Sequence, residues 1–331
     1  MSDRRLISVA VPAYNEAANV PVLAERLRKV FDEHLGGRYD LEVVICENGS
    51  KDTTWDTLLA EHERDPRFKV VQLSRNFHME GGMMAALAHV SGDACIIMSA
   101  DLQDPPEMIP QMIERWEAGD EIVYTVITHR HGESKFRQIA AELFYWSMDQ
   151  VSDTPVPRNA SDFRLVDRKV YEAFNALPER SRMVRALWGW LGFQSSGIEY
   201  ERPAREGGTS KFKVFATAGF AFRGILASSK KAIAVIPVLG VLVSLLSFIG
   251  LLGIVIRAVF FGVPFPGFGT LASIILLLFG FLFLLLGVIA EYVGMIFDET
   301  RGRPHFVQRR TVGFDTPPAR TEPSEVSPEA R

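Results

Sequence analysis

The stretch ACIIMSADLQDPPE, residues 94–107, decides the fold. Its apolar half, residues 94–98, predicts a buried β-strand, and its polar half, residues 99–107, places three carboxylates and one amide where that strand ends. Oxygen ligands of this kind suit Mg²⁺ or Mn²⁺, which usually bridges a protein to the phosphates of a substrate. The stretch therefore favours a metal site for a phosphate-bearing substrate. A solvated acidic turn is the alternative.

Two more apolar segments end in polar residues. The segment 6–11 leads into PAYNE (12–16), and the segment 41–46 leads into ENGSKD (47–52). Ligands of an open α/β sheet bind beyond the carboxyl ends of its strands. We therefore expect the three polar loops to meet at one crevice.

Strand and helix patterns alternate through residue 127. Strands are expected near residues 6, 41, 68, 94 and 121, and helical stretches such as 18–35 have the length of crossover connections. This order predicts an α/β domain with a largely parallel sheet.

Seven motifs occur in a characteristic order: VPAYNE (11–16), GSKDTT (49–54), SRNF (74–77), ADLQDPPE (100–107), DFRLVDR (162–168), WLGF (190–193) and GGTSKF (207–212). With these motifs the chain resembles the family 2 glycosyltransferases of GT-A (Rossmann-like) fold. Within that family it is most similar to the polyprenyl-phosphate glycosyltransferases related to dolichol-phosphate mannosyltransferase, which carry two C-terminal transmembrane helices. Two positions depart from the family pattern, because Asn48 and Ser99 stand where aspartates are usual.

The resemblance implies an inverting, metal-dependent transfer of a sugar from a nucleotide-diphosphate sugar to polyprenyl phosphate, for cell-envelope glycan modification. It assigns the metal, Mg²⁺ or Mn²⁺, to Asp101 and Gln103. The implied catalytic residues are Asp101, Asp162, Arg205 and Lys211. The implied donor-binding residues are Pro12, Tyr14, Glu16, Glu47, Asn48, Asp52, Ser99, Ala100, Asp101, Gln103 and Arg130. The implied acceptor-binding residues are Arg202, Arg205, Ser210 and Lys211.

Two of these assignments have alternatives. Asp162 would help the acceptor or the sugar, but an ion pair with Arg164 or Arg168 explains the same carboxylate. Arg205 and Lys211 flank a glycine pair that fits a loop closing over a diphosphate. A solvated basic linker is the other reading of that segment.

The carboxyl-terminal third has the hydropathy of a membrane protein. Residues 232–256 and 258–290 contain no charged side chain, so only Arg257 interrupts a run long enough for two bilayer crossings. GVPFPGFG (262–269) breaks any helix between them. Cations precede and follow this hairpin, whereas its turn is uncharged, so the positive-inside rule places the large domain in the cytoplasm.

These patterns divide the chain into segments. The expected order is a cytoplasmic GT-A glycosyltransferase domain (1–210), a basic amphipathic interfacial segment (211–231), transmembrane helix 1 (232–257), a short extracytoplasmic turn (258–269), transmembrane helix 2 (270–297) and a cytoplasmic tail (298–331). After Arg310 the tail becomes polar and rich in proline, which predicts disorder. The expected location is the cell's inner (cytoplasmic) membrane, with several passes.

The expected partners are a nucleotide-diphosphate sugar, polyprenyl phosphate and the lipid bilayer, without nucleic acid. Self-association, a flippase and a downstream glycosyltransferase are further partners that fit such an enzyme. Two other functions stay open. A non-catalytic glycosyltransferase-like scaffold would account for the neutral residues at Asn48 and Ser99. A processive polysaccharide synthase would need more spans and a Gln-x-x-Arg-Trp motif, which the sequence lacks.

Overall fold

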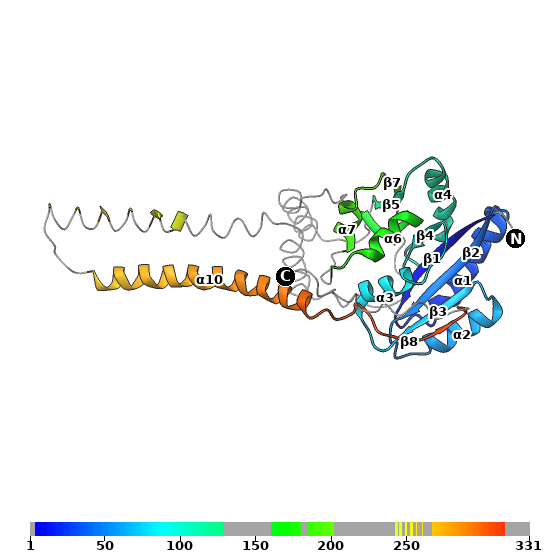
Figure 1. The fold of residues 1–331 in the computed structure, drawn as a ribbon, viewed down its shortest axis with the longest axis horizontal. Helices are drawn as coiled ribbons and strands as arrows, with labels where there is room; N and C mark the ends of the chain where they lie inside the picture. The colour runs from blue at the N-terminus through cyan, green and yellow to red at the C-terminus, as the bar shows by residue number, and fades with distance from the viewer. Residues whose placement is uncertain are drawn as a thin grey trace, which may run out of the picture.

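The computed structural model describes residues 4–128, 160–179, 184–201 and 267–314, with isolated positions between 242 and 260. These residues form an α/β domain and one long helix that projects from it (Figure 1). The expected interfacial segment and transmembrane helix 1 lie outside the described residues, except for those isolated positions.

The domain is built on a mixed sheet, and the described residues contribute eight strands to it in the order β7-β5-β6-β4-β1-β2-β3-β8. The strands are β1 (Arg5–Ala13), β2 (Tyr39–Glu47), β3 (Phe68–Leu73), β4 (Ala94–Ile97), β5 (Ile122–Ile127), β6 (Ala160–Asp167), β7 (Ser195–Tyr200) and β8 (Gln308–Val312). The five strands expected from the sequence are confirmed.

The expectation of a largely parallel sheet holds for four of the seven strand pairings among the described residues, including that of β5 with β7, and the sheet is mixed. β3, β2, β1 and β4 run parallel to one another, as crossover connections require. β6 then inserts between β4 and β5 and is antiparallel to both. β5 and β4 are therefore not neighbours, although they are consecutive among the expected strands.

Helices cover both faces of the sheet. Alternate residues of a strand point to opposite faces. Ile7, Val9 and Val11 of β1 accordingly join one core cluster, and Ala10 joins the other. Residues of α1, α2 and α4 belong to the first cluster, and residues of α3, α6 and α7 belong to the second. The helical elements are α1 (Asn19–Lys29), η1 (Val30–His34), α2 (Thr54–Arg64), α3 (His78–Leu87), η2 (Pro106–Met108), α4 (Ile109–Glu117), α6 (Arg168–Ala176), α7 (Val184–Trp190) and α10 (Phe268–Thr300).

The helix α10 has the length and composition of a membrane span. It contains 33 residues, and its segment Leu278–Phe297 has a mean hydropathy of 2.1 with none of that segment buried. Twenty apolar residues suffice to cross the hydrocarbon core of a bilayer. This helix contains the range 270–297 that the sequence assigns to transmembrane helix 2.

After α10 the chain returns to the sheet as its edge strand β8, which pairs antiparallel with β3. Arg310 anchors it, because its Nε donates to Gln72 at 2.7 Å and its guanidinium lies 3.9 Å from the centre of the Trp55 ring. The expectation of disorder directly after Arg310 is therefore wrong, since the strand continues to Val312. Four of its five residues are polar, so it offered no apolar run to recognise.

Candidate active site

The loops after β1 and β2 are joined by side-chain bonds to backbone groups. Asn15, which has a positive φ of 57°, accepts a bond from the Lys51 backbone nitrogen at 2.8 Å and donates its own backbone N–H to the Ser50 hydroxyl at 3.0 Å. Asn15 therefore turns the β1 loop onto the β2 loop. The expected meeting of these two loops at the carboxyl edge of the sheet is confirmed.

Asp52 continues this junction. Its carboxylate accepts backbone N–H bonds from Thr54 at 3.1 Å and from Ala17 at 3.4 Å. Burial alone would raise the pKa of Asp52, but the bonds from Thr54 and Ala17 outweigh it and lower the pKa. The hydroxyl of Thr54 also accepts from the Glu16 backbone nitrogen at 2.9 Å. Asp52 is thus an anion whose position is set by both loops.

Glu47 and Asn48, at the start of the β2 loop, are buried beneath it, with only 1 % and 3 % of their surfaces exposed. Glu47 accepts the backbone N–H of Ser50. The oxygen of the Asn48 amide accepts the Phe77 backbone N–H at 2.9 Å, and its nitrogen donates to the His78 carbonyl at 2.6 Å.

Asn48 thereby clamps the loop between β3 and α3. His78 needs the support, because its φ of 61° lies in the left-handed region that most residues avoid. Gly49 shows how closely the loops approach, since a Cβ there would stand 2.5 Å from the Arg75 carbonyl carbon. The sequence alone assigned no function to the motif SRNF (74–77). In the structure, this motif belongs to the loop that Asn48 holds in place.

The loop after β4 divides its three carboxylates between different tasks. Asp104 is buried, accepts the Ser99 backbone N–H at 2.9 Å and accepts the Tyr200 hydroxyl at 3.5 Å. Glu107 forms a surface ion pair with Arg26. Asp104 and Glu107 are therefore engaged in contacts within the protein, and neither belongs to the pair, Asp101 and Gln103, to which the resemblance assigns the metal. Asp104 is a residue that sequence reasoning left without a role, and burial was the missing signal.

Asp101 and Gln103, to which the resemblance assigns the metal, lie on either side of a sharp turn in the same loop. They flank Leu102, whose positive φ of 61° and buried side chain turn the loop sharply. Asp101 is half-buried, and its Oδ1 accepts the Gln103 backbone N–H at 3.3 Å. The neighbouring Ala100 is buried. The two side chains supply the hard oxygen donors that Mg²⁺ or Mn²⁺ prefers, so the residues fit such an ion.

A metal at this loop would depend on ligands from the substrate. In the part of the chain that the structure describes, no group of three or more histidine, cysteine, aspartate or glutamate side chains is placed to hold an ion. Mg²⁺ is commonly held by one or two carboxylates together with substrate phosphates. The donor set thus fits an ion shared with a diphosphate better than a metal held by protein alone.

Asp162 lies on β6 beside a buried arginine. The guanidinium of Arg164 is 4.0 Å from its carboxylate, donates to the Ser161 carbonyl at 2.8 Å and lies 5.5 Å from the centre of the Trp188 ring. Arg168 pairs instead with Asp93, at 3.2 Å. Of the two ion pairs that the sequence left open, the structure contains the one with Arg164.

Two further expected residues lie at and just beyond the end of β1. Pro12 packs near Gly82 of α3, and Tyr14 is 38 % exposed beyond the strand. The expected residues Arg130, Arg202, Arg205, Ser210 and Lys211 lie outside the described residues.

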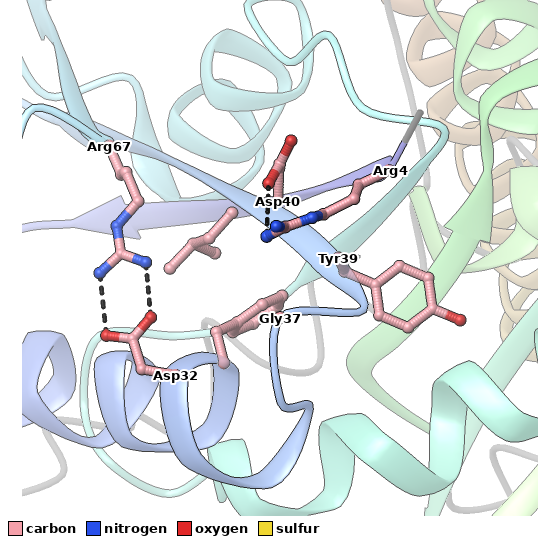
Figure 2. Close-up of a pocket in the computed structure, with 8 residues that line it drawn as sticks. Arg4, Asp32, Gly37, Tyr39, Asp40 and Arg67 are labelled. Atoms are coloured by element: carbon pink, nitrogen blue, oxygen red, sulfur yellow. Dashed lines mark hydrogen bonds and ion pairs between the residues drawn. The ribbon is translucent and has the colours of Figure 1, made fainter. Parts of the chain in front are cut away.

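An open pocket lies at the other edge of the sheet, where β1 and β2 begin (Figure 2). Its charged groups are paired with one another: Arg67 with Asp32 at 2.7 Å, and Arg4 with Asp40 at 3.9 Å. Arg4 and Arg67 directly precede β1 and β3, so these exposed pairs lie where the strands begin. The polar loops of the candidate site follow the opposite ends of the same strands.

Known proteins are similar to this chain along most of its length. Residues 8–174 match the sequence family described as glycosyl transferase family 2. An uncharacterised glycosyltransferase, YkcC of Bacillus subtilis (strain 168), is 34 % identical over 95 % of this chain and 97 % of its own length. The bactoprenol glucosyl transferase of Shigella phage SfX is 34 % identical over 91 % of this chain and 98 % of its own length.

A solved structure is also similar, the mannosyl-3-phosphoglycerate synthase from Rubrobacter xylanophilus. It is 15 % identical, covers 67 % of this chain and 73 % of its own, and has a TM-score of 0.47. From the family match and the full-length relatives it follows that the chain is a member of glycosyl transferase family 2.

Proposed function

We propose that this protein transfers a sugar from a nucleotide-diphosphate sugar to a membrane polyprenyl phosphate. The observation that carries the proposal is the match along nearly the whole chain, including the apolar helix, to proteins named bactoprenol glucosyl transferase. Bactoprenol is a polyprenol, and a polyprenyl phosphate is held in a bilayer. A helix such as α10 would keep a catalytic domain at the surface where that acceptor lies.

This reaction does not require a general base to activate the acceptor. The acceptor phosphate oxygen is already anionic and attacks the anomeric carbon of the sugar. The bond between that carbon and the diphosphate oxygen breaks, and the nucleoside diphosphate leaves with the electron pair, which inverts the anomeric centre. The protein therefore has to position two anions and neutralise the charge that grows on the leaving group.

The described residues have distinct tasks in this reaction. Asp101 and Gln103 would hold the divalent ion, which supplies positive charge at the diphosphate. Asp52, Glu47 and Asn48 fix the loops that form the donor side of the site.

Other assignments extend the proposal beyond the described residues. Arg130 on the donor side, and Arg202, Arg205, Ser210 and Lys211 on the acceptor side, would complete the phosphate sites. The interfacial segment 211–231 and the span 232–257 would make the protein a multi-pass protein of the inner membrane.

The metal assignment is tested by Asp101→Asn, which keeps the shape of the side chain and its acceptor oxygen but removes the charge. Glu107→Gln is the matched control, because it removes a charge from the same loop at an exposed ion pair. We expect Asp101→Asn to lose at least about tenfold in turnover and to need more Mn²⁺ for half-maximal rate, because it loses a charged metal ligand. A tenfold loss corresponds to about 1.4 kcal/mol of transition-state stabilisation. Glu107→Gln should match the parent.

Thermal unfolding of both variants shows whether the domain stays intact. Full turnover of the parent in excess chelator would refute the metal assignment. The absence of sugar transfer with every nucleotide-diphosphate sugar, by a folded parent with added metal, would refute the enzymatic proposal and favour a scaffold.

A further inference from the structure

Two segments that are far apart in the sequence meet beside the end of α10. The Ser74 backbone nitrogen, just before α3, donates to the Val307 carbonyl at 2.9 Å. Gly81 in the first turns of α3 packs against the connector between α10 and β8, since a Cβ there would stand 3.2 Å from the His305 carbonyl oxygen. Figure 1 shows α3 at the end of the domain from which α10 projects. We call residues 74–79 and 301–309 the helix-proximal face.

The helix-proximal face exposes apolar side chains. Met79 is 50 % exposed and Val307 is 46 % exposed. Single exposed apolar residues are common on soluble proteins, and Val22 on α1 is an example at 45 %. Met79 and Val307 differ from Val22 in their location, because they belong to two contacting segments next to the end of α10 that the sequence predicts to be cytoplasmic.

The same face is rich in exposed arginine. Residues 301–309 contain three arginines and no acidic residue, and residues 74–79 add Arg75 without an acidic residue. Arg301 lies with its guanidinium 4.7 Å from the centre of the Phe297 ring, where the apolar segment of α10 ends. The nearest acidic residues along the chain, Glu80 and Glu299, adjoin these two segments. Apolar side chains among cations match the boundary of an anionic membrane.

We propose that the helix-proximal face rests on an anionic lipid surface, with Met79 and Val307 in the headgroup layer and the arginines on lipid phosphates. This inference rests on the proposed membrane function and adds a second contact with the bilayer besides the spans. α3 begins just beyond the carboxyl end of β3, the same edge that carries the candidate site. The contact therefore turns the site toward the leaflet in which the acceptor phosphate lies.

The two native cysteines make a site-specific fluorescence test possible. Cys46 and Cys95 are both fully buried, and burial raises the pKa of each thiol. Because only an exposed thiolate reacts readily, a dye will label an introduced cysteine selectively. Met79→Cys and Val307→Cys report on the face, and Val22→Cys is the matched exposed control.

The full-length variants are labelled with a polarity-sensitive dye and placed in nanodiscs of mixed phosphatidylglycerol and phosphatidylcholine that contain a headgroup-level nitroxide lipid. We expect quenching at Met79→Cys and Val307→Cys to exceed that at Val22→Cys at least about threefold. The difference in quenching between these two variants and Val22→Cys should shrink in nanodiscs of phosphatidylcholine alone. It should also shrink when the cysteine variants additionally carry Arg301→Gln and Arg309→Gln. A response at Met79→Cys no greater than at Val22→Cys overturns the inference, and equal quenching in both lipid mixtures overturns the anionic surface.

A further variant, Ile289→Cys, separates this inference from the proposal on which it rests. Ile289 is exposed within the apolar segment of α10. Ile289→Cys is tested with a nitroxide on the acyl chain of the lipid. If the dye at Ile289→Cys is quenched but the dye at Met79→Cys is not, the second contact is refuted and the membrane anchor stands. If Ile289→Cys is not quenched either, the membrane anchor fails, and the helix-proximal face fails with it.

Discussion

Replacing Asn48 by aspartate, the residue usual in the family pattern, should destabilise this protein. In the parent the amide nitrogen of Asn48 donates to the His78 carbonyl at 2.6 Å, and the side chain is 3 % exposed. An ionised aspartate has no donor for that carbonyl, so two oxygen atoms would face each other. The bond to the Phe77 backbone N–H survives, because it uses the oxygen that both residues share.

The size of the effect follows from what is lost. A buried carbonyl left without its partner costs roughly 1–3 kcal/mol. About 2 kcal/mol lowers the melting temperature by roughly 4–8 °C for a domain of this size. Protonation relieves the conflict, and since one pKa unit is worth about 1.36 kcal/mol, the pKa of the new carboxyl should rise by one to two units on folding.

The sign of the pH dependence follows from that rise. An acid whose pKa is raised on folding is favoured while it is protonated, so Asn48→Asp is closest to the parent below about pH 4, the ordinary pKa of aspartate. Its stability falls as the pH rises through the raised pKa. The melting-temperature gap between parent and variant should therefore be widest near about pH 8.

The assay is thermal unfolding of the full-length protein in detergent, followed by near-ultraviolet circular dichroism. Asn76→Asp is the matched control, because the His78 backbone N–H bonds the Asn76 oxygen at 2.7 Å and aspartate keeps that acceptor. We expect Asn76→Asp to unfold like the parent. An Asn48→Asp protein that is as stable as the parent near pH 8 but has a changed donor ranking would refute the clamp and give Asn48 the nucleotide-reading role expected from the sequence.

Three further predictions concern the framework of the domain. Burial alone would raise the pKa of Glu42, but bonds led by that from Lys69 hold it below its usual range. Glu42→Gln should therefore cost about 1–3 kcal/mol at neutral pH, and the gap to the parent should close in acid-titrated unfolding as the pH falls below about 4, where the parent loses the same contribution. Arg310→Ala should cost about 1–2 kcal/mol through its contacts with Gln72 and Trp55, and chemical unfolding that matches the parent would contradict the anchoring of β8. Gly49→Ala, at a φ of 67°, should cost over about 1 kcal/mol and reduce folded yield, and a parent-like melting curve would contradict the close approach of the two loops.

The parts of the fold that were predictable from the sequence are those whose residue pattern is visible within a short segment. β1, β2 and β4 are buried apolar runs that end in polar loops, and pattern alone locates them. β6 and β8 were not expected as strands of this sheet. Four of the five residues of β8 are polar, and the strand pairs with β3 across more than 230 residues, so only this long-range pairing makes it a strand.

The candidate site was predictable to the level of its loops but not of its side chains. The meeting of the β1 and β2 loops follows from parallel strands. The different environments of Asp101 and Asp104 in the loop after β4 do not follow from the strand pattern, because both are aspartates in the same polar stretch. Burial against Tyr200, from a strand 96 residues away, makes Asp104 a loop-forming residue. Asn48 is similar, since its partners come from another loop.

The central claim is tested most directly by following the sugar itself. Purified full-length protein in liposomes is given a radiolabelled nucleotide-diphosphate sugar and a divalent metal, with polyprenyl phosphate or the matching unphosphorylated polyprenol. The reaction proposed here predicts label in the organic phase only with the phosphorylated lipid, together with one released nucleoside diphosphate per sugar transferred. Label that enters the lipid fraction equally with the unphosphorylated polyprenol, or nucleoside diphosphate released without any labelled lipid, would contradict it.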